Sequence, residues 1–426
     1  MSGLLTARVL SKYFDRVTIV EKDRVNHQPE SRPGQPQTRH LHGLLATGLN
    51  VMTDYFPDLP QALVAHGAVM SDATGDAQWY TYGGYRQRFV SGVCGVAMSR
   101  PLLEHLIRDR VLALPEVELI DQATVKELVT NPARDRVIGA IVAAHGDEPR
   151  TLSLTADLIV DATGRNSHTP QWLVKLGYEP PHESKVEVNV NYATRLYHRD
   201  RQDARSQTWF LNTPEAPKES RFGVMFPIEG DRWLISVGGW HHENTPTDDS
   251  SFLEFVCNLP SPDIYNIISQ SAPLSDMIPH KFPFNLRRHY ERLKRFPAGY
   301  LVLGDAICSF NPTYGQGMTV AALEALELDR LLAKNIATER LAQTFFQRVT
   351  KAIQIPWQMA VGEDFRFPQT TGIKPLGITL LNRYLARLHR ATLHDRVVTA
   401  AFIRVMHLID PPTSLFHPQI IWRVLS

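Results

Sequence analysis

The chain has 426 residues, of which 43% are hydrophobic, and its 45 Lys and Arg nearly balance its 44 Asp and Glu. A chain of this length is too long for one compact core, which predicts two or three domains or one large interleaved α/β unit. The near-zero net charge gives no basic field, which excludes nucleic acid as a partner. The three cysteines form no metal or disulfide pattern, so we expect a reducing, cytoplasmic setting. No run of about 18 apolar residues occurs, so we expect no membrane span.

The N-terminal segment has half of a dinucleotide-binding pattern. Residues 3–14 have the apolar spacing of a helix, and 17–21, Val-Thr-Ile-Val-Glu, have that of a short buried strand. Gly3 stands where such a fold has its third phosphate-loop glycine, and Glu21 follows 18 residues later, close to the spacing of about 20 for the acid that binds a ribose. Nothing precedes this helix, so we expect the first strand and two glycines of the loop to be missing. An ordinary amphipathic helix and strand of another α/β protein would give the same pattern.

The rest of the chain alternates between strand and helix patterns. In chain order we predict a largely helical stretch in 39–66, short strands in 67–98, a helix over 99–114 with Ser99 as N-cap, sheet segments in 117–145 and 151–161, a mostly antiparallel second domain in 178–284 with a helix near 250–258, a buried strand at 300–304, a helix over 317–333 and a mostly helical remainder.

The segment from Leu303 to Met318 is the most informative motif. A buried strand leads to Gly304 and Asp305, and a loop with Pro312, Gly315 and Gly317 then opens a helix. Asp305 has the chemistry to accept a hydrogen bond from a sugar-like hydroxyl, and the Gly-Gln-Gly turn allows backbone N–H groups to approach an anionic or oxygen-rich ring edge. The alternative is an ordinary strand–turn–helix connection.

A third motif, Asp161-Ala-Thr-Gly164-Arg-Asn-Ser, follows another predicted strand. Asp161 and Gly164 indicate a tight turn near the nucleotide, although a plain Asx turn explains the same residues.

Together these motifs resemble the FAD-dependent monooxygenases of the para-hydroxybenzoate hydroxylase-like family. Gly304-Asp305 with Gly315-Gln-Gly317 resembles the family's later fingerprint, and Asp161-Ala-Thr-Gly164 its central one. Arg32-Pro-Gly with Gln35-Pro-Gln37 and His40-Leu-His42 resembles the loop beside the flavin, and Arg100 the arginine that contacts FAD. The resemblance implies this set of cofactor-binding residues: Gly3, Glu21, Lys22, Arg32, Gln37, Arg100, Asp161, Gly164, Gly304, Asp305, Pro312, Gly315, Gln316, Gly317 and Met318.

The resemblance also implies an architecture. We expect an α/β protein in which a Rossmann-like FAD-binding domain is interleaved with a mostly antiparallel β-sheet substrate domain, followed by a helical C-terminal region. The expected ranges are 1–66, 99–177 and 285–345 for the FAD domain, 67–98 and 178–284 for the substrate domain, and 346–426 for the helical region.

In the resembled family, NAD(P)H reduces the flavin, O2 forms a C4a-hydroperoxide, and the distal oxygen goes to the substrate. We therefore expect a hydroxylase or epoxidase for an apolar, aromatic, polyketide-like or isoprenoid-like small molecule, with the cofactor carrying the chemistry and no side chain assigned as catalytic. Ile307-Cys308, where many members have His, favours the epoxidase and polyketide-tailoring branch.

Three alternatives stay open. One is a flavin-dependent reductase or dehydrogenase of an isoprenoid or lipid. Another is a flavin-free prenyl-binding protein on the same fold. A flavin halogenase is disfavoured, because the Trp-x-Trp-x-Ile-Pro segment of those enzymes is absent.

Other residues have simpler interpretations. No metal site is expected from His40, His42 or His241-His242, because no carboxylate or cysteine joins them at ligand spacing. Cys308 is expected to be a buried filler. Trp233, Trp240, Phe222 and Phe226 either line a cavity or form core. The apolar residues of the tail either pack on the FAD domain or dock on a bilayer; they are Ile403, Val405, Met406, Leu408, Leu415, Ile420, Ile421 and Trp422.

Overall fold

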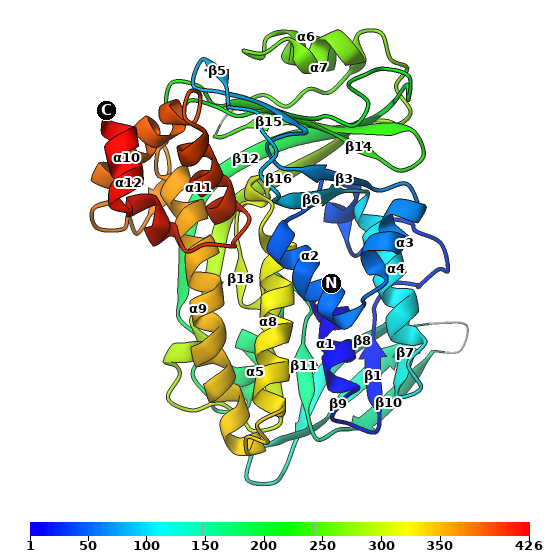
Figure 1. Ribbon diagram of the computed structural model, residues 1–426. Helices are drawn as coiled ribbons and strands as arrows, with labels where there is room; N and C mark the ends of the chain where they lie inside the picture. The colour runs from blue at the N-terminus through cyan, green and yellow to red at the C-terminus, as the bar shows by residue number, and fades with distance from the viewer. Residues whose placement is uncertain (146–148, 242) are drawn as a thin grey trace.

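The computed structural model describes residues 1–145, 149–241 and 243–426. Two short parallel sheets form one part of the fold (Figure 1). In the first, β1 (Val17–Val20) pairs with β7 (Val117–Ile120), and in the second, β11 (Ile159–Asp161) pairs with β17 (Tyr300–Val302). No described strand lies between β1 and β11, and the edges of both strands open onto one cavity.

Helices surround these strands. Their bounds are α1 Ser2–Leu10, α2 Ala46–Tyr55, α3 Leu59–Ala65, α4 Arg100–Leu112, α5 Thr169–Lys175, α8 Gly317–Leu332 and α9 Thr338–Asp364. Ser99 caps α4 as predicted, since its hydroxyl accepts from the Leu102 N–H at 3.2 Å. The predicted helix over 39–66 is only partly correct, because residues 36–39 form a 3-10 turn and Gly43–Leu44 form the short strand β2.

Two smaller antiparallel sheets flank this part of the molecule. One joins β8 (Ala123–Thr130), β9 (Val137–Ala144) and β10 (Arg150–Thr155), and the other joins β2 to β6 (Cys94–Ala97) and β3 (Val69–Asp72).

A nine-stranded, mostly antiparallel sheet forms the second part of the fold, as the sequence predicts. Its order is β18 (Cys308–Ser309), β16 (Ile278–Arg288), β12 (Glu183–His198), β15 (Arg232–Gly239), β14 (Arg221–Ile228), β13 (Trp209–Asn212), β4 (Ala77–Thr81) and β5 (Gly84–Tyr85), with β19 (Thr371–Gly372) beside β12. Strand β16 crosses residue 285, where we place a domain boundary. The division of the chain into domain ranges stays a prediction.

The two faces of this sheet have different neighbours. Helices α6 (Asp249–Cys257) and α7 (Asp263–Ile268) cover the outer face, where Phe252 and Ile264 pack against Ala193 and Ile235. Side chains alternate along a strand. Tyr192, next to Ala193, and Ser236, next to Ile235, therefore belong to the opposite face and line the cavity. The inner face of the sheet therefore forms a wall of the cavity.

The C-terminal region is helical, as predicted, and lies at the upper left of Figure 1. It contains α10 (Ile378–Ala391), α11 (Arg396–Met406) and α12 (Pro418–Leu425). Ile403, Val405, Leu415 and Ile420 are buried in a cluster that also contains Ala46 of α2, so this part of the tail packs on the protein.

Candidate functional site

A cavity of about 2260 Å³ runs through the centre of the molecule. It extends from the facing edges of β1 and β11, past the loop before α8, to the inner face of the nine-stranded sheet and the C-terminal helices. Pockets for one drug-sized ligand measure about 300–1,000 Å³. This cavity therefore has room for a cofactor and a second molecule together.

The loop between β17 and α8 supplies one side of the cavity. Asn311 caps the 3-10 turn Pro312–Tyr314, and Gly315 follows with a φ of 68°, a conformation that strains residues with a Cβ. Helix α8 then begins at Gly317 with no side chain capping it. The first N–H groups of a helix lack intrahelical acceptors and carry positive partial charge, so this end of α8 suits an oxygen-rich or anionic group.

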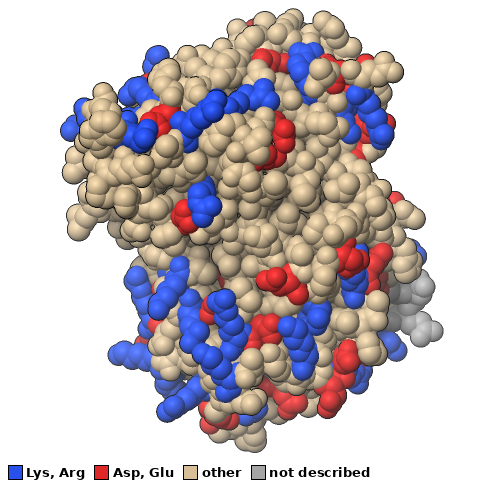
Figure 2. All heavy atoms as spheres, in the orientation of Figure 1, with Lys and Arg blue, Asp and Glu red and all other residues tan. Residues whose placement is uncertain are grey.

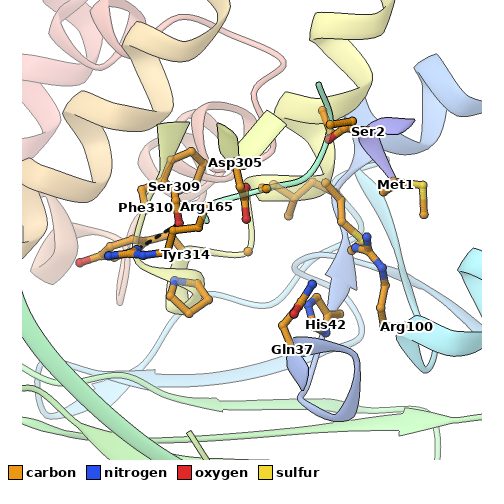
Figure 3. Close-up of a pocket in the computed structure, with 18 of the residues that line it drawn as sticks. Met1, Ser2, Gln37, His42, Arg100, Arg165, Asp305, Ser309, Phe310 and Tyr314 are labelled. Carbon is orange, nitrogen blue, oxygen red and sulfur yellow. Dashed lines mark hydrogen bonds between the residues drawn. The ribbon is translucent and has the colours of Figure 1, made fainter. Parts of the chain in front are cut away.

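Asp305 lies on the cavity surface in this loop, opposite Arg100, Gln37 and His42 (Figure 3). Its side chain is accessible from the cavity although protein surrounds it. Burial raises the pKa of Asp305, while the nearby guanidinium groups of Arg100 and Arg165 oppose the rise. An acceptor in such surroundings is well suited to a hydroxyl donor.

Glu324 of α8 supports the Asp305 turn from behind. This fully buried carboxyl accepts a hydrogen bond of 2.5 Å from the Gly304 N–H. Burial, together with the nearby Asp305, raises the pKa of Glu324 to about 8, against the effect of that hydrogen bond. The group is therefore largely protonated at neutral pH.

Arg32 joins two acids at the other end of the cavity. Its guanidinium lies 3.1 Å from Glu21 at the end of β1 and also contacts Glu104 of α4. Burial alone would raise the pKa of Glu104, but cations including Arg32, Arg100 and Arg108 hold it below its usual range. Sequence patterns single out Glu21 and Arg32 but not Glu104, which appears there as an ordinary helical residue.

Asp161 organises its own loop. The carboxylate accepts from the Thr163 N–H at 2.8 Å and from the hydroxyl groups of Thr163, Ser167 and Thr169. This is the Asx turn that the sequence leaves open as the simpler explanation. Gly164, with a φ of 82°, completes the turn on the cavity wall.

The predicted cofactor residues converge on this cavity, with two exceptions. Those that line it are Gly3, Glu21, Lys22, Arg32, Gln37, Arg100, Asp161, Gly164, Asp305, Pro312, Gly315, Gly317 and Met318. Gly304 is buried behind the turn. Gln316 is also buried, and its amide lies 3.8 Å from the Met359 sulfur, so neither residue reaches the cavity surface.

The inner face of the nine-stranded sheet gives the cavity an aromatic wall. Tyr192 and His280 have ring centroids 5.0 Å apart, Tyr192 and Phe222 6.3 Å, and Phe222 and Trp240 5.6 Å. Phe226 extends this wall. Three of the four aromatic residues discussed from sequence thus line the cavity, whereas Trp233 packs in the outer core.

Three histidines near this wall are held neutral. Burial lowers the pKa of His40 to about 3 and that of His42 to about 4, and it also lowers the pKa of His280. His40 Nδ1 lies 2.9 Å from the Thr194 hydroxyl, which in turn lies 2.6 Å from that of Ser236. These histidines therefore add no positive charge at neutral pH.

A polar group lies at the far end of the cavity. Arg86 lies between the rings of Trp79 and Phe402, each 4.4 Å from its guanidinium carbon, and one Nη donates to His389 at 2.9 Å. The buried Tyr82 hydroxyl and Arg86 Nε have no hydrogen-bond partner among the described residues.

Asp364, the last residue of α9, connects the loop between β17 and α8 to the aromatic wall. Its fully buried carboxylate accepts from Trp240 Nε1 at 2.9 Å, Asn285 Nδ2 at 2.8 Å, Asn311 Nδ2 at 3.0 Å and the Tyr314 hydroxyl at 2.8 Å. Nothing in the local sequence singles out Asp364, because its four donors come from distant parts of the chain.

The site fits an FAD in three respects. Asp305 is a hydroxyl acceptor at the cavity surface, and Arg100 Nε is buried without a hydrogen-bond partner. A Cβ added at Gly164, Gly315 or Gly317 would meet no protein atom within 4 Å and would project into open space. The donors and acceptors are thus those that a dinucleotide with a sugar-alcohol chain requires.

A metal centre has no support in the described part of the chain, where no cluster of three or more His, Cys, Asp or Glu side chains suits an ion. His241 Nε2 lies 3.2 Å from the Thr370 hydroxyl, and His242 lies outside the described residues. Cys308 is a buried filler, as predicted, and burial raises the pKa of its thiol.

Known structures share this fold. The flavin-dependent brominase Bmp2 superposes with a TM-score of 0.67 at 14% identity, covering 100% of this chain and 95% of that one. PqsL of Pseudomonas aeruginosa, a probable FAD-dependent monooxygenase, superposes with a TM-score of 0.58 at 16% identity, covering 86% of this chain and 95% of that one. The molecule thus has the fold of the para-hydroxybenzoate hydroxylase-like flavoproteins, as its motifs predict.

By sequence, the chain belongs to the family of Protein Rv3254 from Mycobacterium tuberculosis (strain ATCC 25618 / H37Rv). The two sequences are 31% identical over 450 residues, which cover 100% of this chain and 91% of that protein. No protein-family model matches the chain.

Proposed function

We propose that this protein is an FAD-dependent monooxygenase that transfers one oxygen atom of O2 to an apolar or aromatic small molecule. NAD(P)H would supply two electrons, so that substrate, O2, NAD(P)H and a proton give oxygenated substrate, NAD(P)+ and water. The observation that carries the proposal is the convergence of Asp305, Arg100 and the uncapped start of α8 on a cavity that continues to an aromatic wall.

The cofactor-binding roles follow from the chemistry of each group. Asp305 would accept from a ribityl hydroxyl and Glu21 from the adenosine ribose, while Arg100, Arg32 and the α8 N-terminus would face the phosphates and the oxygen-rich ring edge. FAD, when bound, supplies the redox chemistry and the reaction with O2. The protein's task is to position the two molecules and to exclude water.

The substrate class follows from the cavity wall. Tyr192, Phe222, Phe226 and Trp240 present ring surfaces, and the neutral histidines add no charge. Aromatic walls of this kind favour apolar ring systems. At the far end, Tyr82 and Arg86 would pair with one polar group of the substrate.

The first experiment is a flavin measurement. We expect purified protein to show flavin absorbance, and Asp305→Ala to lose affinity for FAD by roughly 10- to 100-fold, because a charge-assisted hydrogen bond is worth about 1.5–3 kcal/mol. Asp276→Ala, at an exposed loop position, is the matched control and should bind FAD like the wild type. Unchanged FAD affinity in Asp305→Ala would contradict this assignment.

The second experiment separates the alternative activities. With NAD(P)H and aromatic substrates, O2 consumption that matches oxygenated product supports a monooxygenase. Substrate reduction without O2 uptake would instead indicate a reductase, and halide incorporation would indicate a halogenase. A flavin-free protein that retains isoprenoid ligands would indicate a binding protein.

A further inference from the structure

The outer surface of the C-terminal helices is unusually apolar. Eight of the fifteen large hydrophobic side chains that are exposed among the described residues lie in the last 56 residues. Six of them define what we call the C-terminal apolar surface: Ile373, Leu376, Leu380, Phe416, Trp422 and Leu425. Leu376 is 104% exposed, Ile373 76%, Leu380 73% and Trp422 68%. Contiguous apolar surface of this kind marks interaction sites.

The elements that carry these residues pack together. Helix α10 contacts α12, and α12 contacts the turn Pro412–Phe416. The Tyr384 ring of α10 stacks on Phe416 at 5.0 Å, and its hydroxyl donates to the Leu415 carbonyl at 2.6 Å. In Figure 1, α10 and α12 lie side by side at the upper left. The exposed apolar residues therefore belong to one part of the molecular surface.

The segment that carries this surface also has an excess of basic residues. Residues 371–426 contain seven Lys and Arg but two acids, a formal charge of +5, whereas the whole chain carries +1. Both acids are paired internally, Asp395 with Arg423 at 2.7 Å and Asp410 with Arg404 at 2.6 Å. Blue side chains gather over the C-terminal helices at the upper left of Figure 2. The charge thus favours an anionic partner.

Helix α10 combines both properties on one face. Leu380, Arg383, Arg387 and Arg390 are exposed and follow one another at intervals of three or four residues, the spacing of a single helical face. Arg390 pairs with Glu215 at 2.6 Å, but no carboxylate among the described residues forms an ion pair with Arg383 or Arg387. This face of α10 therefore places the cationic groups of Arg383 and Arg387 beside the exposed Leu380.

The central cavity reaches this surface. Leu376 and Phe416 are exposed and also line the cavity, as do Pro375 and Gly377 beside Leu376. None of the described helices is both long and apolar enough to cross a bilayer. Contact with a membrane through this surface would be peripheral and would place an opening of the cavity at the lipid.

We propose that the C-terminal apolar surface docks on an anionic lipid bilayer, with the cavity opening at Leu376 and Phe416 facing the membrane. Apolar side chains would enter the interface, and Arg383 and Arg387 would pair with lipid phosphates. The docking itself does not depend on the flavin. If the proposed oxygenation also holds, the substrate class narrows to lipophilic molecules that enter the cavity from the bilayer.

Vesicle sedimentation tests this proposal on the full chain. We expect the wild type to sediment with vesicles of phosphatidylcholine and phosphatidylglycerol and much less with phosphatidylcholine alone. Arg383→Gln and Arg387→Gln should each weaken binding roughly fivefold at low ionic strength, since a basic residue near an anionic surface contributes about 1 kcal/mol. The double variant Leu376→Asp/Leu380→Asp should weaken it by at least about tenfold.

Matched controls separate docking from misfolding. Val90→Asp and Val174→Asp alter side chains that are 85% and 56% exposed elsewhere, and they should bind vesicles like the wild type. All variants should keep the wild-type melting temperature because the altered residues are exposed. Flavin content should not change either, which separates this result from a failure of the proposed function.

Three outcomes would overturn the proposal. The first is a wild type that does not sediment with anionic vesicles. The second is equal loss of binding in the Val90 and Val174 controls. The third is a wild-type dimer without vesicle affinity that becomes monomeric in Leu376→Asp/Leu380→Asp, because that result assigns the surface to a second copy of the chain.

Discussion

Asp364 gives the sharpest test of how the site is held together. Replacing it with alanine removes the acceptor of four hydrogen bonds, from Trp240, Asn285, Asn311 and Tyr314, in a fully buried place. Each buried donor left without an acceptor costs about 1–3 kcal/mol, so four cost roughly 4–12 kcal/mol. A folded protein has a total stability of about 5–15 kcal/mol. We therefore expect Asp364→Ala to remove a large part of the stability.

Asp364→Asn is the graded comparison. The asparagine oxygen can replace the Oδ1 that accepts from Trp240, Asn311 and Tyr314, so only the bond from Asn285 is lost. The expected cost is about 1–3 kcal/mol. The unfolding entropy per residue implies a fall in Tm of roughly 1 °C per kcal/mol when 426 residues unfold together. We expect Tm to fall by about 1–3 °C in Asp364→Asn and by about 4–12 °C in Asp364→Ala.

Thermal unfolding followed by circular dichroism measures both effects. Asp58→Ala is the control, because its carboxylate is 70% exposed and pairs only at the surface, with Arg110; it should change stability by less than about 1 kcal/mol. The reasoning fails if Asp364→Ala melts within about 1 °C of the wild type, or if both Asp364 variants are equally destabilised.

Two further predictions concern the carboxyl groups of Glu324 and Glu21. The pKa of Glu324 is raised from an ordinary 4.5 to about 8 in the folded protein. Between these two pH values the folded protein keeps the proton while the unfolded chain loses it, so the folded protein loses stability as pH rises from about 4.5 to 8. Glu324→Gln should remove that loss and melt higher than the wild type at pH 8 but not at pH 4.5, and parallel Tm–pH profiles for the two proteins would contradict it. Glu21→Ala should weaken FAD binding roughly 10- to 100-fold in a titration, because a charge-assisted hydrogen bond to the ribose would be lost. Wild-type affinity would show that Glu21 does not bind the ribose and acts through its contacts with Arg32 and the Asp23 N–H.

The sequence predicts the loop between β17 and α8 correctly because its signals are local. A strand followed by Gly304-Asp305 and a Gly-Gln-Gly turn requires a short loop before a helix, and the structure has that loop at the cavity. Asp161 shows the limit of this reasoning. Its spacing predicts a turn correctly, but only the structure shows that the loop itself uses both carboxylate oxygens.

The substrate side depends on contacts between distant residues. Tyr192 and Phe222 lie in β12 and β14, and Trp240 directly follows β15. They form one wall because sheet pairing brings these strands together. Arg86 and His389 are neighbours across 303 positions of sequence. No spacing rule connects such residues, so the sequence names aromatic candidates without assigning them to core or cavity.

The sequence alone thus determined the fold class, the order of the motifs and the residues at strand ends, because turns, caps and helix starts depend on neighbours a few positions away. Tertiary structure decided which of these residues reach the cavity, why Gln316 does not, and how Asp364 ties α9 to the loop before α8. It also divided the tail into a buried face that contains Ile403 and Leu415 and an exposed face that contains Leu380 and Trp422. Burial is a property of the assembled surface, and a run of apolar residues does not by itself specify which of them will face water.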